Sequence, residues 1–529
     1  MPMFTQYSSF QTLRDLAQNP IDLTAKGTFS PKRLDEMQLA TKDYFFSYAG
    51  QRVTSDVMRA LYSLAGEAQV FDKMRAMQEG EVVNHIEGYE SENRKVLHTA
   101  MRDFFDNRIE ADSAKVATEL AYKEFEKLKE FLETVDKGGY TDLVQIGIGG
   151  SELGPKAVYM ALKAFSKEGR RVHFISNVDP DDAAAVLAPL DLKKTLAVVV
   201  SKSGGTLETR TNEELVREYF KKEGLDPVHH MVAVTGKGSP MDDPKKYMES
   251  FYMWDYVGGR YSATSMVGCV ALGFALGMEK TLEFLRGAAC MDKHALNAPK
   301  EENLPLHLAL LGIWNRNFLG HMTCAVIPYS QAMVRFSAHL QQLDMESNGK
   351  RIDKSGVAVD HATGPVIWGE PGTNGQHSFY QLIHQGTNEV PVEFIGFRET
   401  QLDADIEFKG TTSQEKLLSN LFAQSIGLAT GQANENPNKV FPGNRPNSLL
   451  CLKKCDPFAV GFLLSMYEHK VAYQGFIWNI NSFDQEGVQL GKVLANEIID
   501  VFAAVREDKA PSKGDSSLGS YLIEQMNRL

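Results

Sequence analysis

The feature that most constrains the fold of this chain is a repeated order of apolar run, turn and helical stretch. From residue 141 the runs DLVQIGIGG, VHFISN, TLAVVVS and HMVAVTG alternate with helical stretches such as GPKAVYMALKAF and TNEELVREYFKK. Short apolar runs bounded by turns are typical of buried strands, and strands that alternate with helices form parallel sheets. We therefore expect a parallel α/β unit here.

A second alternation begins near residue 322 with the runs MTCAVIPYS, GPVIWGE and VPVEFIGF, whereas the first 110 residues show mainly helical patterns. A chain of 529 residues is long enough for two or more cores. We expect a helical segment at 1–110 that packs on the larger domain, a smaller α/β domain at 111–280, a larger one at 281–505 and a C-terminal arm at 506–529.

Composition argues against several classes of protein. The net charge is -12 and no run of Lys and Arg appears, which argues against a nucleic-acid binder. Five scattered cysteines favour reduced thiols over disulfides or a zinc site, so no metal is expected. The uncharged stretch at 261–278 is rich in glycine and hydroxyl residues, which favours a buried helix over a membrane span. Since no secretory signal is evident, we expect a cytoplasmic protein.

Two turns that follow predicted strands are typical of phosphate-binding loops. Both join a strand to a helix, where backbone N–H groups and the helix dipole favour an anion without positive net charge. The candidate residues are Gly150 and Ser151 in the first turn, and Ser201, Lys202, Ser203 and Thr206 in the second. Glycine-rich turns are often only structural, but two neighbouring turns of this kind favour a phosphate site.

Seven blocks, in this order along nearly the whole chain, resemble the phosphoglucose isomerase family. They are GIGGSELGP, SKSGGTLET, GGRYSATSMVG, QQLDMESNGK, GEPGTNGQHSFYQLIHQG, FPGNRPNS and NSFDQEGVQLGK. The resemblance implies two sugar-isomerase-type α/β domains with parallel sheets flanked by helices, and a homodimer that interconverts glucose 6-phosphate and fructose 6-phosphate. No cofactor is implied.

The same resemblance implies a role for individual residues. The base of the family matches Glu346, its active-site arginine Arg260, its histidine His377 and its ring-opening lysine Lys492. The phosphate loop matches Ser201, Lys202, Ser203 and Thr206, and Gly150, Ser151 and Gln342 line the sugar side. The implied dimer brings His377 into the site from the other subunit. Three positions depart from the family pattern, namely Gly205, where Thr is usual, Glu486 and Gln489.

The chemistry of an aldose–ketose isomerase suits these residue types. A carboxylate such as Glu346 can move a proton between two neighbouring carbons, and the fixed charge of Arg260 can stabilise the enediolate between them. His377 and Lys492 are the groups available for ring opening, and the sequence leaves open which of them donates the proton. Three alternatives stay open: an isomerase of mannose 6-phosphate, a regulator that only binds phosphosugars, and an extracellular signalling role.

Overall fold

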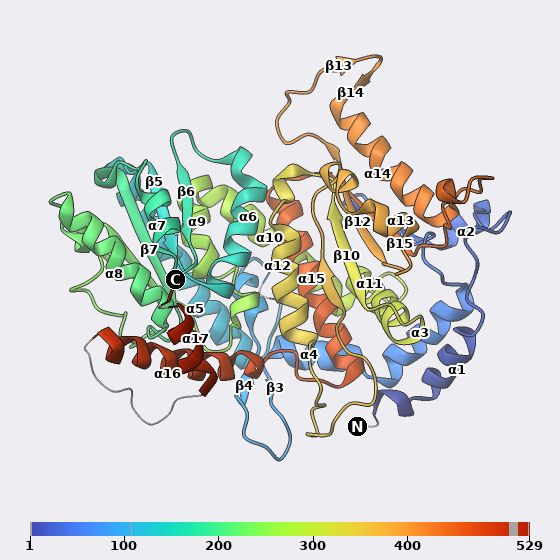
Figure 1. Ribbon diagram of the computed structural model, residues 1–529, viewed down its shortest axis with the longest axis horizontal. Helices are drawn as coiled ribbons and strands as arrows, with labels where there is room; N and C mark the ends of the chain where they lie inside the picture. Colours follow the sequence, from blue (N-terminus) through green and yellow to red (C-terminus); the bar gives the residue numbers. More distant parts are fainter. Residues whose placement is uncertain (1–2, 107, 507–516, 527) are drawn as a thin grey trace. The chain divides into compact units, whose positions relative to one another are not determined.

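The computed structural model describes residues 3–106, 108–506, 517–526 and 528–529. The chain forms two compact units, Met1–Ser482 and Phe483–Leu529. The first unit contains two separate sheets, and Figure 1 shows them with helices α6, α10, α12 and α15 between them. The bounds of these helices are Leu153–Leu162, Met278–Asn297, Phe336–Gln341 and Pro457–Trp478. Almost every residue of α15 is buried, because it packs against neighbours on all sides.

The first sheet has five parallel strands in the order β6-β5-β7-β8-β9. Their bounds are Asp142–Ile146 for β5, Arg171–Ile175 for β6, Thr195–Ser201 for β7, Met231–Thr235 for β8 and Glu249–Tyr252 for β9. The flanking helices are α5 (Asp112–Gly138), α7 (Pro180–Leu187), α8 (Leu207–Lys222) and α9 (Met266–Leu276). All residues of α9 are buried, which confirms the buried helix expected within 261–278.

The second sheet has six strands in the order β1-β2-β15-β12-β10-β11. Strands β10 (Thr323–Pro328), β11 (Val366–Trp368), β12 (Val392–Glu399) and β15 (Asn447–Lys454) are parallel. Strands β1 (Gln38–Ala40) and β2 (Tyr44–Ser47) extend this sheet in antiparallel fashion. The N-terminal segment, expected to be mainly helical, therefore also supplies two strands of this sheet, and both are too short to give a clear strand pattern in the sequence.

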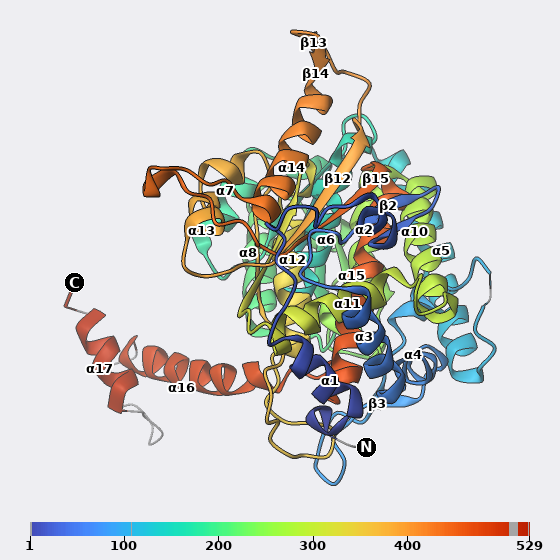
Figure 2. The same cartoon turned by 90° about the vertical axis from the view of Figure 1, so that its right-hand side faces the viewer.

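Figure 2 also shows the other helices and strands of the first unit. Their bounds are α1 Ser8–Leu16, α2 Pro31–Glu36, α3 Ser55–Glu67, α4 Val70–Glu79, β3 Val82–Asn84, β4 Arg94–Lys95, α11 Leu304–Ile313, α13 Tyr380–Gln385, β13 Glu407–Phe408, β14 Thr411–Thr412 and α14 Ser413–Thr430. Figures 1 and 2 both show β13 and β14 as a hairpin that projects beyond the end of α14. The domain boundaries at 110, 280 and 505 stay predictions.

The second unit contains helices α16 (Gln489–Arg506) and α17 (Ser517–Met526), which contact each other. It exposes large apolar side chains, among them Leu490, Val493, Tyr521 and Leu522. All five cysteines of the chain are free thiols, as expected, although Cys290 is exposed. Within the described ranges, no helix is long and apolar enough to cross a bilayer.

Candidate active site

The loop at residues 201–206, which joins β7 to α8, is lined with hydroxyl groups. It lies beyond the carboxyl end of a parallel strand, where ligands of α/β proteins bind. Ser201 Oγ lies 3.0 Å from Thr206 Oγ1, and Ser203 Oγ accepts a hydrogen bond of 3.2 Å from the Gly205 N–H. Thr206 directly precedes α8 without capping it through its side chain. The positive end of the α8 dipole therefore faces the loop and favours an anion there.

The side chain of Lys202 connects this loop to the segment that follows β9. Its Nζ donates to the carbonyl of Val257 at 3.1 Å and lies 3.5 Å from the carbonyl of Asp255. Burial lowers the pKa of the Lys202 ammonium, and the positive charge of Arg94 lowers that pKa further. Lys202 therefore joins the hydroxyl-lined loop to the segment that leads into Arg260.

The loop after β5 packs directly on the turn that precedes this arginine. It contains a short 3-10 turn at Gly149–Ser151, in which Gly149 has a φ of +59°. A Cβ atom on Gly150 would lie 2.3 Å from the carbonyl carbon of Gly259, so the two backbones are in contact. A Cβ atom on Gly149 would lie 3.5 Å from Gln342 Nε2, which places that amide beside the same loop. Three distant parts of the chain thus meet here.

Arg260 lies in the 3-10 turn Gly259–Tyr261 and is only 2% exposed. Its Nε donates to Ser347 Oγ at 2.6 Å, and its Nη2 donates to the carbonyl of Ser482 at 2.7 Å. Its Nη1 lies 3.4 Å from Glu346 Oε2. Tight hydrogen bonds between a guanidinium and a carboxylate are near 2.8 Å. Arg260 is therefore held firmly by neutral acceptors and only loosely by the carboxylate.

Glu346 ends a π-helical turn, Gln342–Glu346, that continues α12. Its side chain is 19% exposed, and its Oε2 is buried without a hydrogen-bond partner. Irregular turns of this kind are frequent at functional sites, because they change which side chains face a cleft. A carboxylate oxygen that accepts no hydrogen bond can take a proton from a bound carbon acid, while the neighbouring guanidinium stabilises the negative charge that develops.

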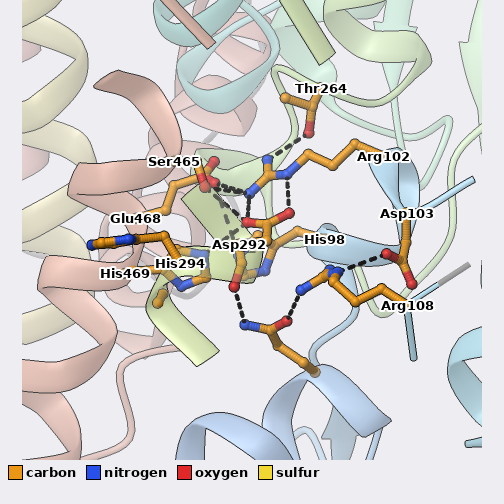
Figure 3. A network of polar contacts seen from close by, with 12 residues as sticks. His98, Arg102, Asp103, Arg108, Thr264, Asp292, His294, Ser465, Glu468 and His469 are labelled. Carbon is orange, nitrogen blue, oxygen red and sulfur yellow. Dashed lines mark hydrogen bonds and ion pairs between the residues drawn. The ribbon is translucent and has the colours of Figure 1, made fainter. Parts of the chain in front are cut away.

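Figure 3 shows a fully buried polar network around Arg102. This network contacts the Arg260 turn through the rings of His98 and Tyr261. Arg102 donates to both carboxylate oxygens of Asp292 at 2.8 Å and to Glu468 at 2.6 Å. It also donates to Thr264 Oγ1, just beyond the Arg260 turn, at 3.0 Å. Arg102, Asp292 and Glu468 are at most 1% exposed. The network places two carboxyl groups around one arginine. Burial raises the pKa of one of these groups, that of Glu468, to about 7.

His98 links this network to the Arg260 turn by ring contact. The His98 imidazole stacks on Tyr261, with ring centroids 4.7 Å apart, and its Nε2 lies 3.9 Å from Glu468 Oε2. Burial keeps the pKa of His98 well below its ordinary value, so the ring is neutral at neutral pH. The Tyr261 hydroxyl lies 2.9 Å from Ser347 Oγ. The network therefore packs against the Arg260 turn through the neutral ring of His98.

The structure brings together some of the residues that the sequence predicts for the site. Backbone and side-chain contacts join Gly150, Gln342, Arg260 and Glu346, and Lys202 joins the hydroxyl-lined loop to them. Ser151 adds a contact within this region, since its carbonyl accepts from Gln145 Nε2 at 2.7 Å.

The structure places His377 elsewhere. It is exposed and lines a cavity of about 430 Å³ with Tyr380, His384, Gln424 and Phe441. Lys492 is exposed on helix α16 of the second unit.

Sequence reasoning missed the residues that hold Arg260. Ser347 and Ser482 lie inside two of the seven blocks, QQLDMESNGK and NSFDQEGVQLGK, whose predicted site residues are Gln342, Glu346 and Lys492. A serine beside a candidate base is a weak signal by itself, since serine hydroxyls bond locally in many turns. Among the described residues, no cluster of His, Cys, Asp and Glu is arranged to hold a metal ion.

One parallel and one mainly parallel sheet, a hydroxyl-lined loop at a helix N-terminus and a carboxylate beside a buried arginine define an α/β protein of the phosphosugar-isomerase class. The family model described as phosphoglucose isomerase matches residues 47–521. The chain belongs to this family.

Individual relatives agree with this assignment over almost the full length of the chain. The glucose-6-phosphate isomerase of Protochlamydia amoebophila is 57% identical over 511 residues, which cover 96% of this chain and 95% of the relative. That of Desulfotalea psychrophila is 51% identical, with 99% of this chain and 100% of the relative covered. A crystal structure of a glucose-6-phosphate isomerase from Chlamydia trachomatis is 48% identical, covers 99% of both chains and superposes with a TM-score of 0.95. The expected fold class is thereby confirmed.

Proposed function

We propose that this chain is an aldose–ketose isomerase that interconverts glucose 6-phosphate and fructose 6-phosphate, in glycolysis and gluconeogenesis. One observation carries the proposal: Glu346 Oε2 is buried, accepts no hydrogen bond and lies 3.4 Å from Arg260 Nη1. A base and a fixed cation at this separation are what a C1–C2 proton transfer needs. The names of the relatives at 57% and 51% identity support the same reaction.

The phosphate of the substrate is assigned to the hydroxyl-lined loop. Ser201, Ser203 and Thr206 offer hydroxyl donors at the N-terminus of α8, and backbone N–H groups of the loop add to them. Lys202 contributes positive charge near the loop, although its ammonium also donates to the carbonyl of Val257. Anchoring one end of the sugar in this way converts binding energy into correct placement of C1 and C2.

The proton transfer is assigned to Glu346 and Arg260, with Gly150, Ser151 and Gln342 along the sugar. The Glu346 carboxylate takes the proton from C2 of open-chain glucose 6-phosphate, and the electrons of that C–H bond form the C1–C2 double bond. The carbonyl oxygen gains negative charge, which the guanidinium of Arg260 stabilises. The proton of the C2 hydroxyl then passes to O1 and Glu346 returns its proton to C1, so that C2 becomes the ketone and C1 becomes the CH2OH group of fructose 6-phosphate. The steps balance without an oxidant or reductant, and we propose no cofactor.

Ring opening precedes this transfer and is assigned to His377 and Lys492. One group must protonate the ring oxygen while another takes the proton of the anomeric hydroxyl. His titrates closest to neutral pH, which suits either role, and the residues leave open which of the two donates.

The proposed working form is a homodimer, in which His377 acts in the site of the other subunit. His377 is exposed beside a cavity of about 430 Å³, and the second unit exposes apolar side chains such as Leu490 and Tyr521. Large apolar side chains that are exposed together often mark a surface that binds another protein.

We also propose that the enzyme works in the cytoplasm, where its five free thiols stay reduced, and that it needs neither nucleic acid nor a membrane.

Co-expression of Glu346→Gln with His377→Ala tests the shared site. If His377 acts across the interface, each mixed dimer has one intact site, and a statistical mixture regains about a quarter of the wild-type activity. If His377 acts within its own chain, both sites of a mixed dimer carry a lesion and no activity returns. Each variant expressed alone is the control.

The reaction itself is tested by following the conversion of fructose 6-phosphate to glucose 6-phosphate with purified protein and a coupled reporter. We expect turnover that is far faster than with mannose 6-phosphate. Faster turnover of mannose 6-phosphate would assign the chain to the other isomerase, whereas binding of both sugars without turnover would indicate a regulator.

A further inference from the structure

The buried arginine beside Glu346 is fixed by residues that directly follow Glu346 in the chain. Ser347 Oγ accepts from Arg260 Nε at 2.6 Å, and Ser347 is fully buried. The next residue, Asn348, is also fully buried, and its Oδ1 accepts from the Ser482 hydroxyl at 2.7 Å. The carbonyl of that same Ser482 accepts from Arg260 Nη2 at 2.7 Å. Two consecutive residues thus hold two nitrogens of one guanidinium, one directly and one through a serine.

We propose that Ser347 and Asn348 are positioning residues that set the plane of the Arg260 guanidinium relative to the Glu346 carboxylate. The inference rests on the proposed isomerase function. Because Glu346, Ser347 and Asn348 are consecutive, the base and the supports of the cation belong to one rigid segment. Any movement of this segment carries the carboxylate and the guanidinium together, which preserves the 3.4 Å separation between Nη1 and Oε2.

The two groups that accept hydrogen bonds from Arg260 here are a serine hydroxyl and a backbone carbonyl, and both are neutral. A buried arginine is usually paired with acids, as Arg102 is with Asp292 and Glu468 in the same protein. Ser347 and Ser482 instead offer a hydroxyl and a carbonyl, which orient the guanidinium without themselves neutralising it. A tight bond from the guanidinium to Glu346 would weaken the base, which the 3.4 Å separation avoids.

The surroundings keep both supports in place. The Tyr261 hydroxyl lies 2.9 Å from Ser347 Oγ, so a second polar group holds the serine in one rotamer. Asn348 Nδ2 donates to the carbonyl of Val471 in helix α15 at 3.1 Å. A Cβ atom on Gly475, also in α15, would lie 1.9 Å from Ser482 Oγ, so only glycine leaves room for that serine. The supports are thus tied to α15, a helix in which almost every residue is buried.

The test compares Ser347→Ala with Ser337→Ala, a matched loss of a buried serine hydroxyl. Ser337 lies in helix α12 and is 1% exposed, and its hydroxyl donates to the carbonyl of Val326 at 2.8 Å. In Ser347→Ala we expect kcat for fructose 6-phosphate to fall about 10- to 100-fold, because a small displacement of Arg260 weakens enediolate stabilisation. KM should stay within about threefold, since the phosphate loop is untouched. Ser337→Ala should keep the kcat of the wild type.

A second readout separates positioning from a general loss of structure. With glucose 6-phosphate deuterated at C2, the kinetic isotope effect on kcat should rise in Ser347→Ala, because proton transfer becomes more rate-limiting. A smaller fraction of folded enzyme would lower kcat without changing the isotope effect. If Ser347→Ala does not fold, Tyr261→Phe removes the second hydroxyl while keeping the ring that stacks on His98, and it should show a smaller fall of the same kind.

Two results would overturn the proposal: a wild-type kcat in both Ser347→Ala and Tyr261→Phe, or a reduced kcat with an unchanged isotope effect. The first would show that Arg260 holds its position without these hydroxyls. Neither result bears on the reaction itself, since an active wild-type enzyme keeps the proposed function intact. Wild-type protein that turns over no phosphosugar would instead refute the proposed function.

Discussion

Gly150→Ala should damage the site through a single methyl group. A Cβ atom on Gly150 would lie 2.3 Å from the carbonyl carbon of Gly259 and 2.4 Å from its oxygen. Non-bonded carbon atoms prefer separations of about 3.5–4.0 Å, so the two backbones must move apart by about 1 Å. Gly150 does not have a positive φ, so the clash, and not backbone strain, is the cause of the movement.

The displacement reaches Arg260, the proposed catalytic arginine, directly, because Gly259 precedes it in the same turn. A misplacement of about 1 Å can cost on the order of 100-fold in rate, and overpacking typically costs about 1–3 kcal/mol of folding free energy. We expect kcat/KM for fructose 6-phosphate to fall about 100-fold in the coupled assay. We expect the free energy of unfolding in urea to fall by about 1–3 kcal/mol.

Gly66→Ala is the matched control. Gly66 lies in helix α3, and a Cβ atom there would meet nothing within 4 Å. This substitution should keep full activity and stabilise the helix by about 0.5–1 kcal/mol. Wild-type activity in Gly150→Ala, at unchanged stability, would refute the contact between the two turns and with it the account of how Arg260 is placed.

Three further predictions concern the loop and a buried acid. Ser203→Ala and Thr206→Ala should each raise KM about three- to tenfold at unchanged kcat, as expected for one lost hydrogen bond to phosphate; a fall in kcat at constant KM would contradict the loop assignment. Gly205→Thr should fit, because a Cβ there meets only Ser203 Oγ at 3.8 Å, and isothermal titration should show phosphosugar affinity equal to or higher than that of the wild type. Burial raises the pKa of Asp344 to about 7. The folded chain therefore keeps a proton that the unfolded chain releases above a pH of about 4. The free energy of unfolding falls as the pH rises from about 4 to about 7. Asp344→Asn removes this pH-dependent loss of stability. In thermal melts, the Tm of the variant minus the Tm of the wild type should therefore increase from pH 4 to 7. A difference in Tm that stays constant with pH would contradict the assignment.

The sequence predicts much of the sheet architecture, because most core strands are short, uninterrupted apolar runs. Strands β5, β7, β8, β10 and β12 lie where those runs predict them. Strand β15 was not anticipated, since its segment NSLLCLKK mixes polar and apolar residues. Strands β1 and β2 are too short for their pattern to be distinguished from a loop.

The sequence predicts local features of the candidate site, whereas contacts between distant parts of the chain cannot be read from it. The hydroxyl-lined loop follows directly from glycines and hydroxyl residues between a strand and a helix. Arg260 meets Ser347 and Ser482 across 87 and 222 positions of sequence, and no local pattern encodes such contacts. The placement of His377 and Lys492 in the working site depends on the second subunit and the second unit, and it stays a prediction.

The most direct test of the account is turnover of fructose 6-phosphate in D₂O by the wild type and by Glu346→Gln. The account predicts that the wild type forms glucose 6-phosphate without added metal or cofactor, and that part of this product carries deuterium at C2, because the proton held by Glu346 exchanges with solvent in some turnovers before it is returned. Glu346→Gln should still bind the phosphosugar, while turnover and labelling fall by about 100- to 10,000-fold, the usual contribution of a positioned base. Equal turnover and labelling in the two proteins would contradict the account, because the proton would then be moved by another group.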